Sequence, residues 1–337
     1  FCPAVAAAGG CTTLDWEGLT TFFGFGYFGG DRTHFDGVRI LRPATHYRLA
    51  GNGRVLEETR YWQWQHAPDH SRTYDETVGE FARLFETVMG ELTSAERVAV
   101  PISGGLDSRS TVATLPADQA HERLWAYSYG YGNDSMETAI ARQVAGARGL
   151  TFDAFTIGPY LFAQLPQISA AVEGFEDVTQ CRQAAVVNEI DDHADYLIGA
   201  HLGDLYLADM GLVGVDELSD EELTAVVLKK VHKGGSDWLL EHLCRPHLKE
   251  AVPEDIFHEN VAAELDRLDT IAEPDFRVKA YKVDQWCARW TTVAFRMYQA
   301  AAFPRLPFYD NRLEDFFCTV PTEMVSGRRL QIDYLRR

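Results

Sequence analysis

Six consecutive residues have the types and spacing to bind a phosphate group. They follow an apolar, β-branched stretch at 98–102 and precede a segment with helical character at 109–115. In chain order they are Ser103, Gly104, Gly105, Leu106, Asp107 and Ser108. A strand, a glycine-rich turn and a helix N-terminus together direct free N–H groups and the positive end of the helix dipole at an anion. The sequence therefore predicts an anion site here, with an ordinary tight βα turn as the alternative.

The side chains of this loop add specific chemistry to the backbone site. We expect the two glycines to take φ > 0 and to let the backbone approach a phosphate closely. Ser103 and Ser108 supply hydroxyl donors, and the Asp107 carboxylate can hold a magnesium ion that bridges phosphates. The order Ser-Gly-Gly-x-Asp-Ser favours a phosphate-binding loop over a plain turn.

A second group of polar residues follows the apolar stretch at 196–198. It begins at Gly199 and ends at Asp204, with His201 between them. A carboxylate at the end of a neighbouring strand can share a metal ion with Asp107 across a triphosphate. The alternative for Asp204 is to cap a helix N-terminus. His201 titrates near neutral pH and could act as a donor or general base, although a structural histidine is the other interpretation.

The loop at 103–108 resembles the pyrophosphate-binding loop of the N-type ATP pyrophosphatases, and it is most similar to the version in the asparagine synthetase family. It is not a Walker loop, because the chain contains no Gly-Lys-Ser/Thr. The resemblance implies ATP and Mg²⁺ as cofactors. It also implies attack of a substrate carboxylate on the α-phosphorus, release of pyrophosphate, and amidation of the acyl-adenylate by ammonia or an amine.

The resemblance also implies roles for particular residues. Residues 103–108, Tyr129 and Gly199 would bind ATP, with Tyr129 on the strand that contributes to the family's adenine pocket. Asp107 and Asp204 would hold the metal and act in catalysis. His201 is counted with them as a catalytic candidate on its residue type alone, not on the resemblance. No residue is assigned the family's catalytic lysine, because the match ends with the chain.

The chain departs from the family at the second turn. A glycine-glutamate-glycine turn followed by aspartate and a second acidic residue is usual there, whereas this chain has Ala200-His201-Leu202 and then Leu205. The expected substrate is thus a small-molecule or peptide carboxylate. Asparagine synthetase-like amidation is the first hypothesis. A specialised amide-forming or cyclising relative with a substrate other than aspartate, and a nucleotide-binding partner protein without catalysis, are the alternatives.

The chain divides into three segments by pattern and resemblance. Residues 1–65 resemble the end of the family's glutaminase domain and the hairpin that links it to the synthetase domain, ending at Tyr61-Trp62. Too few residues precede that hairpin for a glutaminase domain, so we do not interpret Cys2 as its nucleophile. The glutaminase part is either missing from the protein or lies outside this sequence. Residues 66–215 form the expected ATP pyrophosphatase (PP-loop) domain, and 216–337 its helical C-terminal part.

Alternating strands and helices predict the fold class of the central segment. Strands are expected at 98–102, 124–129, 150–155 and 196–199, and helices at 74–92, 109–115, 135–147, 160–172 and 180–193. Such alternation predicts an α/β domain with a parallel, doubly wound sheet that binds ligands at the carboxyl ends of its strands. The resemblance implies the adenine nucleotide alpha hydrolase-like type.

Composition excludes several classes of partner. The 337 residues carry a formal net charge of −19, which disfavours nucleic acid, because such binding depends on Lys and Arg contacts to phosphates. No run of about 18 apolar residues and no basic leader occur, so we expect no membrane partner and a cytoplasmic location. The six scattered cysteines suggest neither a zinc site nor disulfides. A homodimer is compatible with the sequence, which does not give the oligomeric state.

Overall fold

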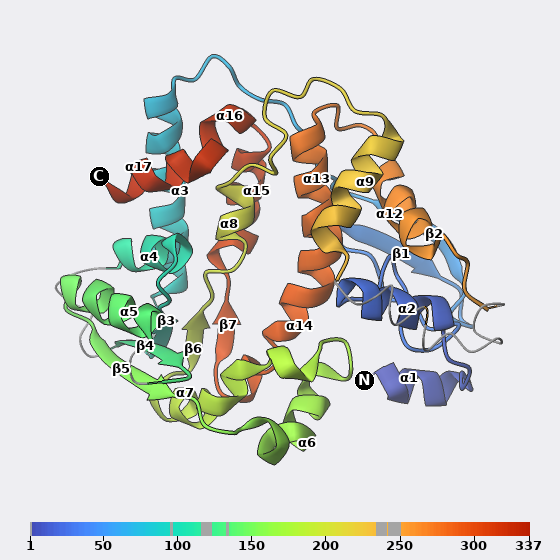
Figure 1. Cartoon of the computed structure of the whole chain (residues 1–337), viewed down its shortest axis with the longest axis horizontal. Coiled ribbons are helices and arrows are strands. Elements are labelled where there is room, and N and C mark those ends of the chain that lie inside the picture. Colours follow the sequence, from blue (N-terminus) through green and yellow to red (C-terminus); the bar gives the residue numbers. More distant parts are fainter. Residues whose placement is uncertain (1, 95–96, 116–122, 133–134, 234–240, 242–250) are drawn as a thin grey trace. The chain divides into compact units, whose positions relative to one another are not determined.

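The computed structural model describes residues 2–94, 97–115, 123–132, 135–233, 241 and 251–337 (Figure 1). Contacts between residues divide the chain into two compact units. Unit 1 comprises Phe1–His66 with Val215–Thr292, and unit 2 comprises Ala67–Gly214 with Val293–Arg337. Within the described part of the chain, every helix is too short or too polar to cross a membrane.

Unit 2 is built on a parallel sheet, as the sequence predicted. Its strands are β3 (Val98–Pro101), β4 (Leu124–Gly130), β5 (Thr151–Thr156), β6 (Tyr196–Ile198) and β7 (Phe303–Arg305). Their order across the sheet is β5-β4-β3-β6-β7, with every pairing parallel. The chain starts in the middle, moves to one edge through β4 and β5, and then reverses to β6 and β7. The topological switch point therefore lies between β3 and β6, where ligands bind in open α/β sheets.

The edge strand β7 was not predicted. It lies in a segment that the sequence analysis assigned to a helical C-terminal part, yet Phe303 pairs with Tyr196 and Arg305 with Ile198. A three-residue strand containing Pro304 gives little sequence signal, and an edge position is where a sheet tolerates proline. As a consequence, residues 293–337 belong to the same compact unit as the sheet.

Helices surround this sheet. Those of unit 2 are α3 (Tyr74–Leu92), α4 (Leu106–Ala113), α5 (Met136–Ala147), α6 (Leu161–Val172), η1 (Val178–Gln180), η2 (Arg182–Val186), α7 (Val187–His193), α8 (Gly203–Tyr206), η4 (Tyr298–Ala300), η5 (Pro307–Tyr309), α15 (Asn311–Phe317), α16 (Thr322–Val325), η6 (Ser326–Arg328) and α17 (Arg329–Leu335). The long amphipathic α3 spans the predicted range and begins at a capping box formed by Thr73 and Glu76.

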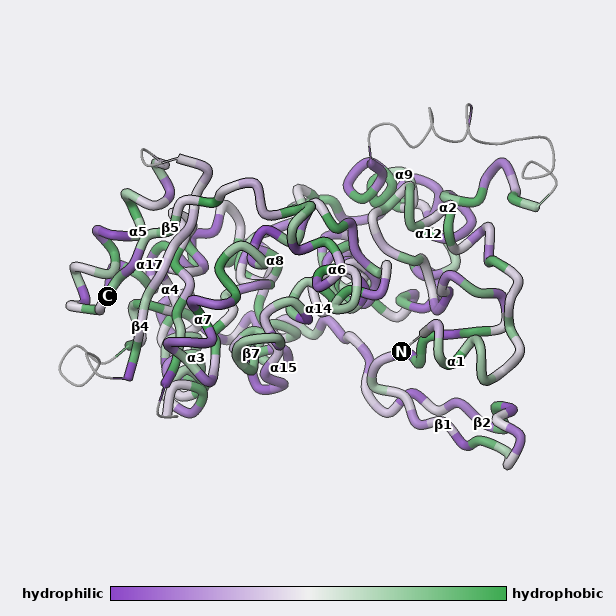
Figure 2. The backbone as a smooth tube through the Cα atoms, turned by 90° about the horizontal axis from the view of Figure 1, so that it is seen from below, coloured by the Kyte–Doolittle hydropathy of each residue, from purple (hydrophilic) through white to green (hydrophobic). Residues whose placement is uncertain are grey.

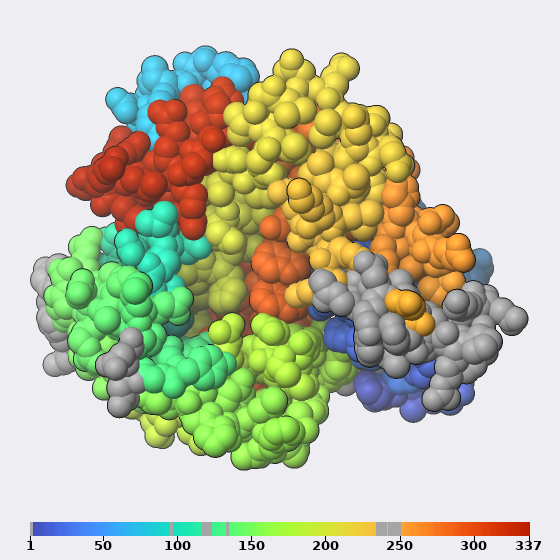
Figure 3. Space-filling view, in the orientation of Figure 1, coloured from blue at the N-terminus to red at the C-terminus, as the bar shows by residue number. Residues whose placement is uncertain are grey.

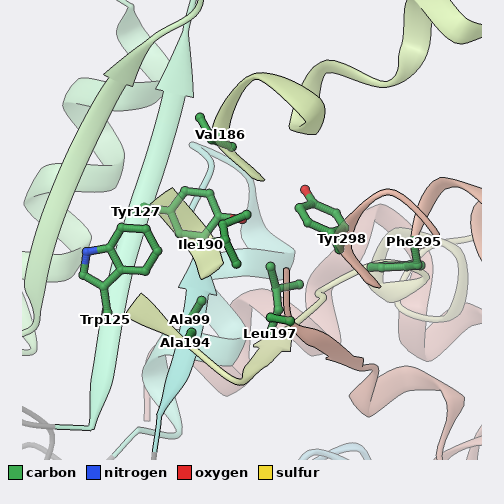
Figure 4. Close-up of a cluster of buried hydrophobic side chains, with 10 residues drawn as sticks. Ala99, Trp125, Tyr127, Val186, Ile190, Ala194, Leu197, Phe295 and Tyr298 are labelled. Carbon is green, nitrogen blue, oxygen red and sulfur yellow. The ribbon is translucent and has the colours of Figure 1, made fainter. Parts of the chain in front are cut away.

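A buried cluster joins the sheet to α7 and to the segment before β7. Trp125 and Tyr127 of β4 stack with ring centroids 4.9 Å apart. They pack with Ile190 of α7, Leu197 of β6 and Tyr298 (Figure 4). Burial of these large apolar groups fixes β6 beside β3 and so determines where the turn after β6 lies.

A second aromatic cluster holds the C-terminal helices against α3. Phe81 and Phe85 of α3 are fully buried and contact Phe308, Phe317 and Tyr334. Figure 3 shows the C-terminal segment, in red, on the surface beside the light-blue and teal segments that contain α3 and α4. This packing places residues near 330 beside α4, the helix that follows the loop at 103–108.

Unit 1 contains mostly helices and one hairpin. Its helices within the described residues are α1 (Cys2–Gly9), α2 (Trp16–Phe25), α9 (Asp220–Val231), α12 (Ile256–Asp266), α13 (Pro274–Lys282) and the π-helix η3 (Val283–Thr291). The short α14 (Thr292–Ala294) begins at the last residue of this unit. The predicted hairpin is confirmed as β1 (Thr45–Leu49) paired antiparallel with β2 (Val55–Arg60). The strand β2 is almost wholly exposed, and its tube is mostly purple and white in Figure 2.

Candidate active site at the switch point

The loop between β3 and α4 is held by its two serines. The Ser108 hydroxyl donates to the backbone oxygens of Ser103 (3.0 Å) and Gly105 (3.2 Å) and accepts from the N–H of Ser103 (3.1 Å). The Ser103 hydroxyl accepts from the N–H of Gly105 (3.2 Å). Arg109 donates to the carbonyl of Gly104 (2.7 Å). These bonds fold the loop back onto the start of α4.

The N-terminus of α4 is available to an anion. Its N-cap is Gly105, and no side chain among the described residues caps the first turn. The first N–H groups of a helix then need an external acceptor, which a phosphate supplies. The expected φ > 0 was wrong: Gly105 is extended, with φ −79° and ψ 161°, and Gly104 is not among the described glycines with positive φ.

Asp107, in the first turn of α4, lies at the centre of a polar group. Its Oδ1 accepts from the guanidinium of Arg328 and from Nε2 of Gln331 (3.0 Å), and Gln331 also donates to the Ser110 hydroxyl (3.0 Å). Burial raises the pKa of Asp107, the neighbouring charge of Asp204 raises it further, and Gln331 and Arg328 act in the opposite direction. The site therefore holds a partly desolvated carboxylate beside a cation.

The turn after β6 approaches Asp107 closely. A Cβ on Gly203 would lie 2.7 Å from Oδ1 of Asp107 and 2.9 Å from the ring of Phe308, so only glycine fits there. Leu202 precedes it with φ 74°, a left-handed conformation that strains a branched side chain. The turn thus brings the exposed Asp204 to the same edge of the sheet as Asp107, as the sequence predicted for two strand ends.

His201 lies in the same turn. Its ring contacts Phe295 edge-to-face at 4.5 Å. Surrounding protein lowers the pKa of His201 through desolvation, and Asp204 partly opposes this shift. Although the residue is exposed, the neutral imidazole is favoured, and a neutral imidazole can accept a proton.

The remaining predicted ATP-binding residues face the protein interior. Tyr129 packs against the cluster of Figure 4, and burial raises its pKa. Gly199 continues the sheet by donating to the carbonyl of Arg305 (2.9 Å). A Cβ there would lie 2.6 Å from Leu306 and from Phe295. Both residues shape the walls around the switch point, and their roles toward ATP stay predictions.

The donor set is compatible with magnesium. Magnesium is usually bound by one or two carboxylates, with waters and substrate phosphates completing its shell. Asp107 and Asp204 provide two carboxylates, and the described residues contain no cluster of three or more His, Cys, Asp or Glu that could hold a metal alone. Cys2 has no described side chain and Cys244 lies outside the described residues, while Cys11, Cys181, Cys287 and Cys318 are not in disulfides.

Sequence reasoning missed Arg328 and Gln331. The signal in the sequence was a Gly-Arg-Arg segment followed two residues later by a glutamine. Arg328 and Gln331 are three residues apart, and this spacing places both on one side of a helix start. The glutamine is fully buried, and a buried amide requires a specific polar partner. That partner lies more than two hundred residues earlier in the chain, and the sequence does not give such a pairing.

The sheet order and the loop at its switch point define a nucleotide-binding α/β domain of the PP-loop type. Residues 81–205 match the model of the asparagine synthase family. The resemblance of the loop and of the turn after β6 to that family is therefore confirmed over this segment. The match supports the assignment of this chain to the broad class of ligases that use ATP.

Two solved structures show a weak likeness to the chain. One is an NH3-dependent NAD synthetase from Campylobacter jejuni in complex with the nitrate ion, with 13% identity and a TM-score of 0.30, covering 57% of this chain and 94% of that one. The other is an NMN synthetase from Francisella tularensis, with 15% identity and a TM-score of 0.28, covering 62% and 93%. No curated protein matches the sequence.

Proposed function

We propose that unit 2 activates a carboxylate with ATP and that the activated acyl group is then transferred to ammonia or an amine. The observation that carries this proposal is the convergence of the uncapped α4 N-terminus, Asp107 and Asp204 at the switch point. In this reaction a carboxylate oxygen bonds to the α-phosphorus as pyrophosphate leaves. The nitrogen then bonds to the acyl carbon as AMP leaves.

The residues of the chain would share this work. The N–H groups at the start of α4 and the Arg328 guanidinium would face phosphate oxygens and stabilise the charge that develops on them. Asp107 and Asp204 would hold Mg²⁺, which would supply Lewis-acid polarisation of the phosphates. His201, kept neutral by its surroundings, would be placed to accept a proton from the attacking amine.

The turn after β6 supports a substrate other than aspartate. Leu202 is buried, and His201 lies where the family usually has a glutamate, so an acidic group is replaced by a neutral ring next to the expected acceptor site. Asparagine synthetase-like amidation stays our first hypothesis. Within the same chemistry, this turn supports a specialised carboxylate, small or peptidic, as the second substrate class.

The direct test is exchange of labelled pyrophosphate into ATP in the presence of candidate carboxylates. Asp107→Asn and Asp204→Asn should each reduce exchange by at least about a hundredfold, since each removes a metal ligand. Asp195→Asn is the matched control, because Asp195 lies just before the N-terminal end of β6, away from the turn that holds Asp204, and pairs with Arg97 at 2.9 Å. ADP as the product would contradict the proposal. Nucleotide binding without turnover would favour the partner-protein alternative.

A further inference from the structure

A buried glutamine in the C-terminal helix α17 directs the N–H groups of its amide at polar atoms of α4. Gln331 is fully buried, and its Nε2 donates to Oδ1 of Asp107 and to the Ser110 hydroxyl, at 3.0 Å each. Both neighbours are acceptors here, because the Ser110 hydroxyl donates its own hydrogen to the carbonyl of Leu106 (3.0 Å). The amide nitrogen of Gln331, and not its oxygen, must therefore face α4.

Packing alone does not explain this glutamine. Its Oε1 is buried with no hydrogen-bond partner among the described residues, and an unpaired buried oxygen lowers stability. An apolar side chain of similar size would fill the same space without that cost. A buried polar group that costs stability calls for another explanation, and the two N–H groups aimed at α4 supply one.

The two oxygens of the Asp107 carboxylate have different surroundings. Every hydrogen bond that described residues donate to this carboxylate comes from Gln331 or Arg328 and ends on Oδ1. Oδ2 accepts none of them and is not among the buried atoms that lack a partner, so it is open to solvent. A hydrogen bond on one oxygen fixes the orientation of a carboxylate and leaves the other oxygen for a cation.

The turn that leads into α17 is fixed on its other side as well. Gly327 and Arg328 have left-handed φ values of 60° and 62°, and for an arginine this conformation persists only where the surrounding structure holds it. The N–H of Gly327 donates to Oδ2 of Asp209 (3.0 Å), which follows Asp204 and α8 in the chain. The C-terminal segment therefore contacts both segments that carry the expected metal ligands.

We propose that Gln331 is a positioning residue for Asp107, holding Oδ1 so that Oδ2 stays open to the cation that accompanies ATP. This inference rests on the function proposed for unit 2, because Gln331 touches neither substrate nor nucleotide and acts through Asp107 alone. It gives α17 a part in the site that neither the loop at 103–108 nor the turn after β6 supplies.

The test measures how much Mg²⁺ the protein needs to bind ATP. ATP is titrated by calorimetry over a range of Mg²⁺ concentrations and in EDTA. Gln331→Leu should raise the half-saturating Mg²⁺ concentration roughly tenfold or more, as expected when the partner of a metal-binding carboxylate is removed. ATP affinity in EDTA should stay within about twofold of the wild type, because the N–H groups at the start of α4 are unchanged. An unchanged Mg²⁺ requirement, or an equal loss of ATP affinity with and without Mg²⁺, would overturn the proposal.

Gln285→Leu is the matched control. Gln285 is a buried glutamine of unit 1 whose Nε2 also donates to a carboxylate, Oε2 of Glu264 at 2.8 Å, so this variant loses the same type of bond elsewhere. It should leave the Mg²⁺ requirement unchanged, and a shift as large as that of Gln331→Leu would count against a specific role.

Asp107→Asn separates this inference from the proposed function. An unaltered Mg²⁺ requirement in Asp107→Asn would contradict the metal assignment itself. A raised requirement in Asp107→Asn together with an unaltered one in Gln331→Leu would overturn only the role of Gln331.

A measurement on the wild-type protein decides the matter if Gln331→Leu fails to fold. In a crystal structure with Mn²⁺ and a non-hydrolysable ATP analogue, the anomalous peak of manganese should lie at Oδ2 of Asp107, with Gln331 still bonded to Oδ1. A metal on Oδ1 with Gln331 displaced would refute the proposal, as would a metal bound away from Asp107.

Discussion

Glu176 carries a carboxyl group that the fold of unit 2 keeps away from water. The residue is 2% exposed. Its Oε2 accepts from the thiol of Cys181 at 3.6 Å, and its Oε1 has no partner among the described residues. Burial raises the pKa of Glu176 to about 7, with a further rise from Asp177 and an opposing effect of the Cys181 hydrogen bond. Above neutral pH the folded protein must therefore hold a poorly solvated charge.

The consequence for stability follows from proton linkage. An ordinary glutamate in the unfolded chain titrates near 4.5, so between this value and about 7 only the folded protein keeps the proton. The free energy of unfolding must then fall as the pH rises through this window, and the loss is complete above it. The span corresponds to about 3 kcal/mol. Glu176→Gln cannot ionise and should escape the loss.

Urea unfolding at several pH values measures this effect. Glu176→Gln should be more stable than the wild type by about 2–3 kcal/mol near pH 8 and nearly equal to it near pH 4. Glu137→Gln, which alters an exposed carboxylate at the start of α5, should show no comparable change. A difference between Glu176→Gln and wild type that stays constant with pH, or a wild type that is the more stable protein at pH 8, would refute the reasoning.

Three further predictions concern the site and its support. Gly203→Ala places a Cβ 2.7 Å from the Asp107 carboxylate and should weaken ATP binding by calorimetry roughly tenfold, about 1.4 kcal/mol. Gly146→Ala, which meets open space, should leave binding unchanged. Arg328→Gln should slow pyrophosphate exchange roughly tenfold or more through loss of a charge that faces the phosphates, and unaltered exchange would exclude that role. Phe85→Ala, at a fully buried position, should cost about 3–5 kcal/mol in denaturant unfolding.

The parts of the fold that the sequence predicted are those with strong local signals. The amphipathic α3 and the buried strands β3 and β4 carry their periodicity within a few residues. The hairpin in unit 1 follows from alternation around two glycines. The loop after β3 and the turn after β6 were placed together because parallel strands end at one edge of a sheet. That inference needed no knowledge of which side chains touch.

What the sequence did not yield depends on contacts between distant parts of the chain. The strand β7 forms because β6 offers it an open edge, and its three residues would not form a strand alone. The pairing of Asp107 with Arg328 arises because Phe81 and Phe85 hold the C-terminal helices against α3. That packing adds a cation, which the loop residues themselves do not contain, to the edge where a triphosphate would lie. The chemistry expected at this site therefore depends on the aromatic packing as much as on the loop.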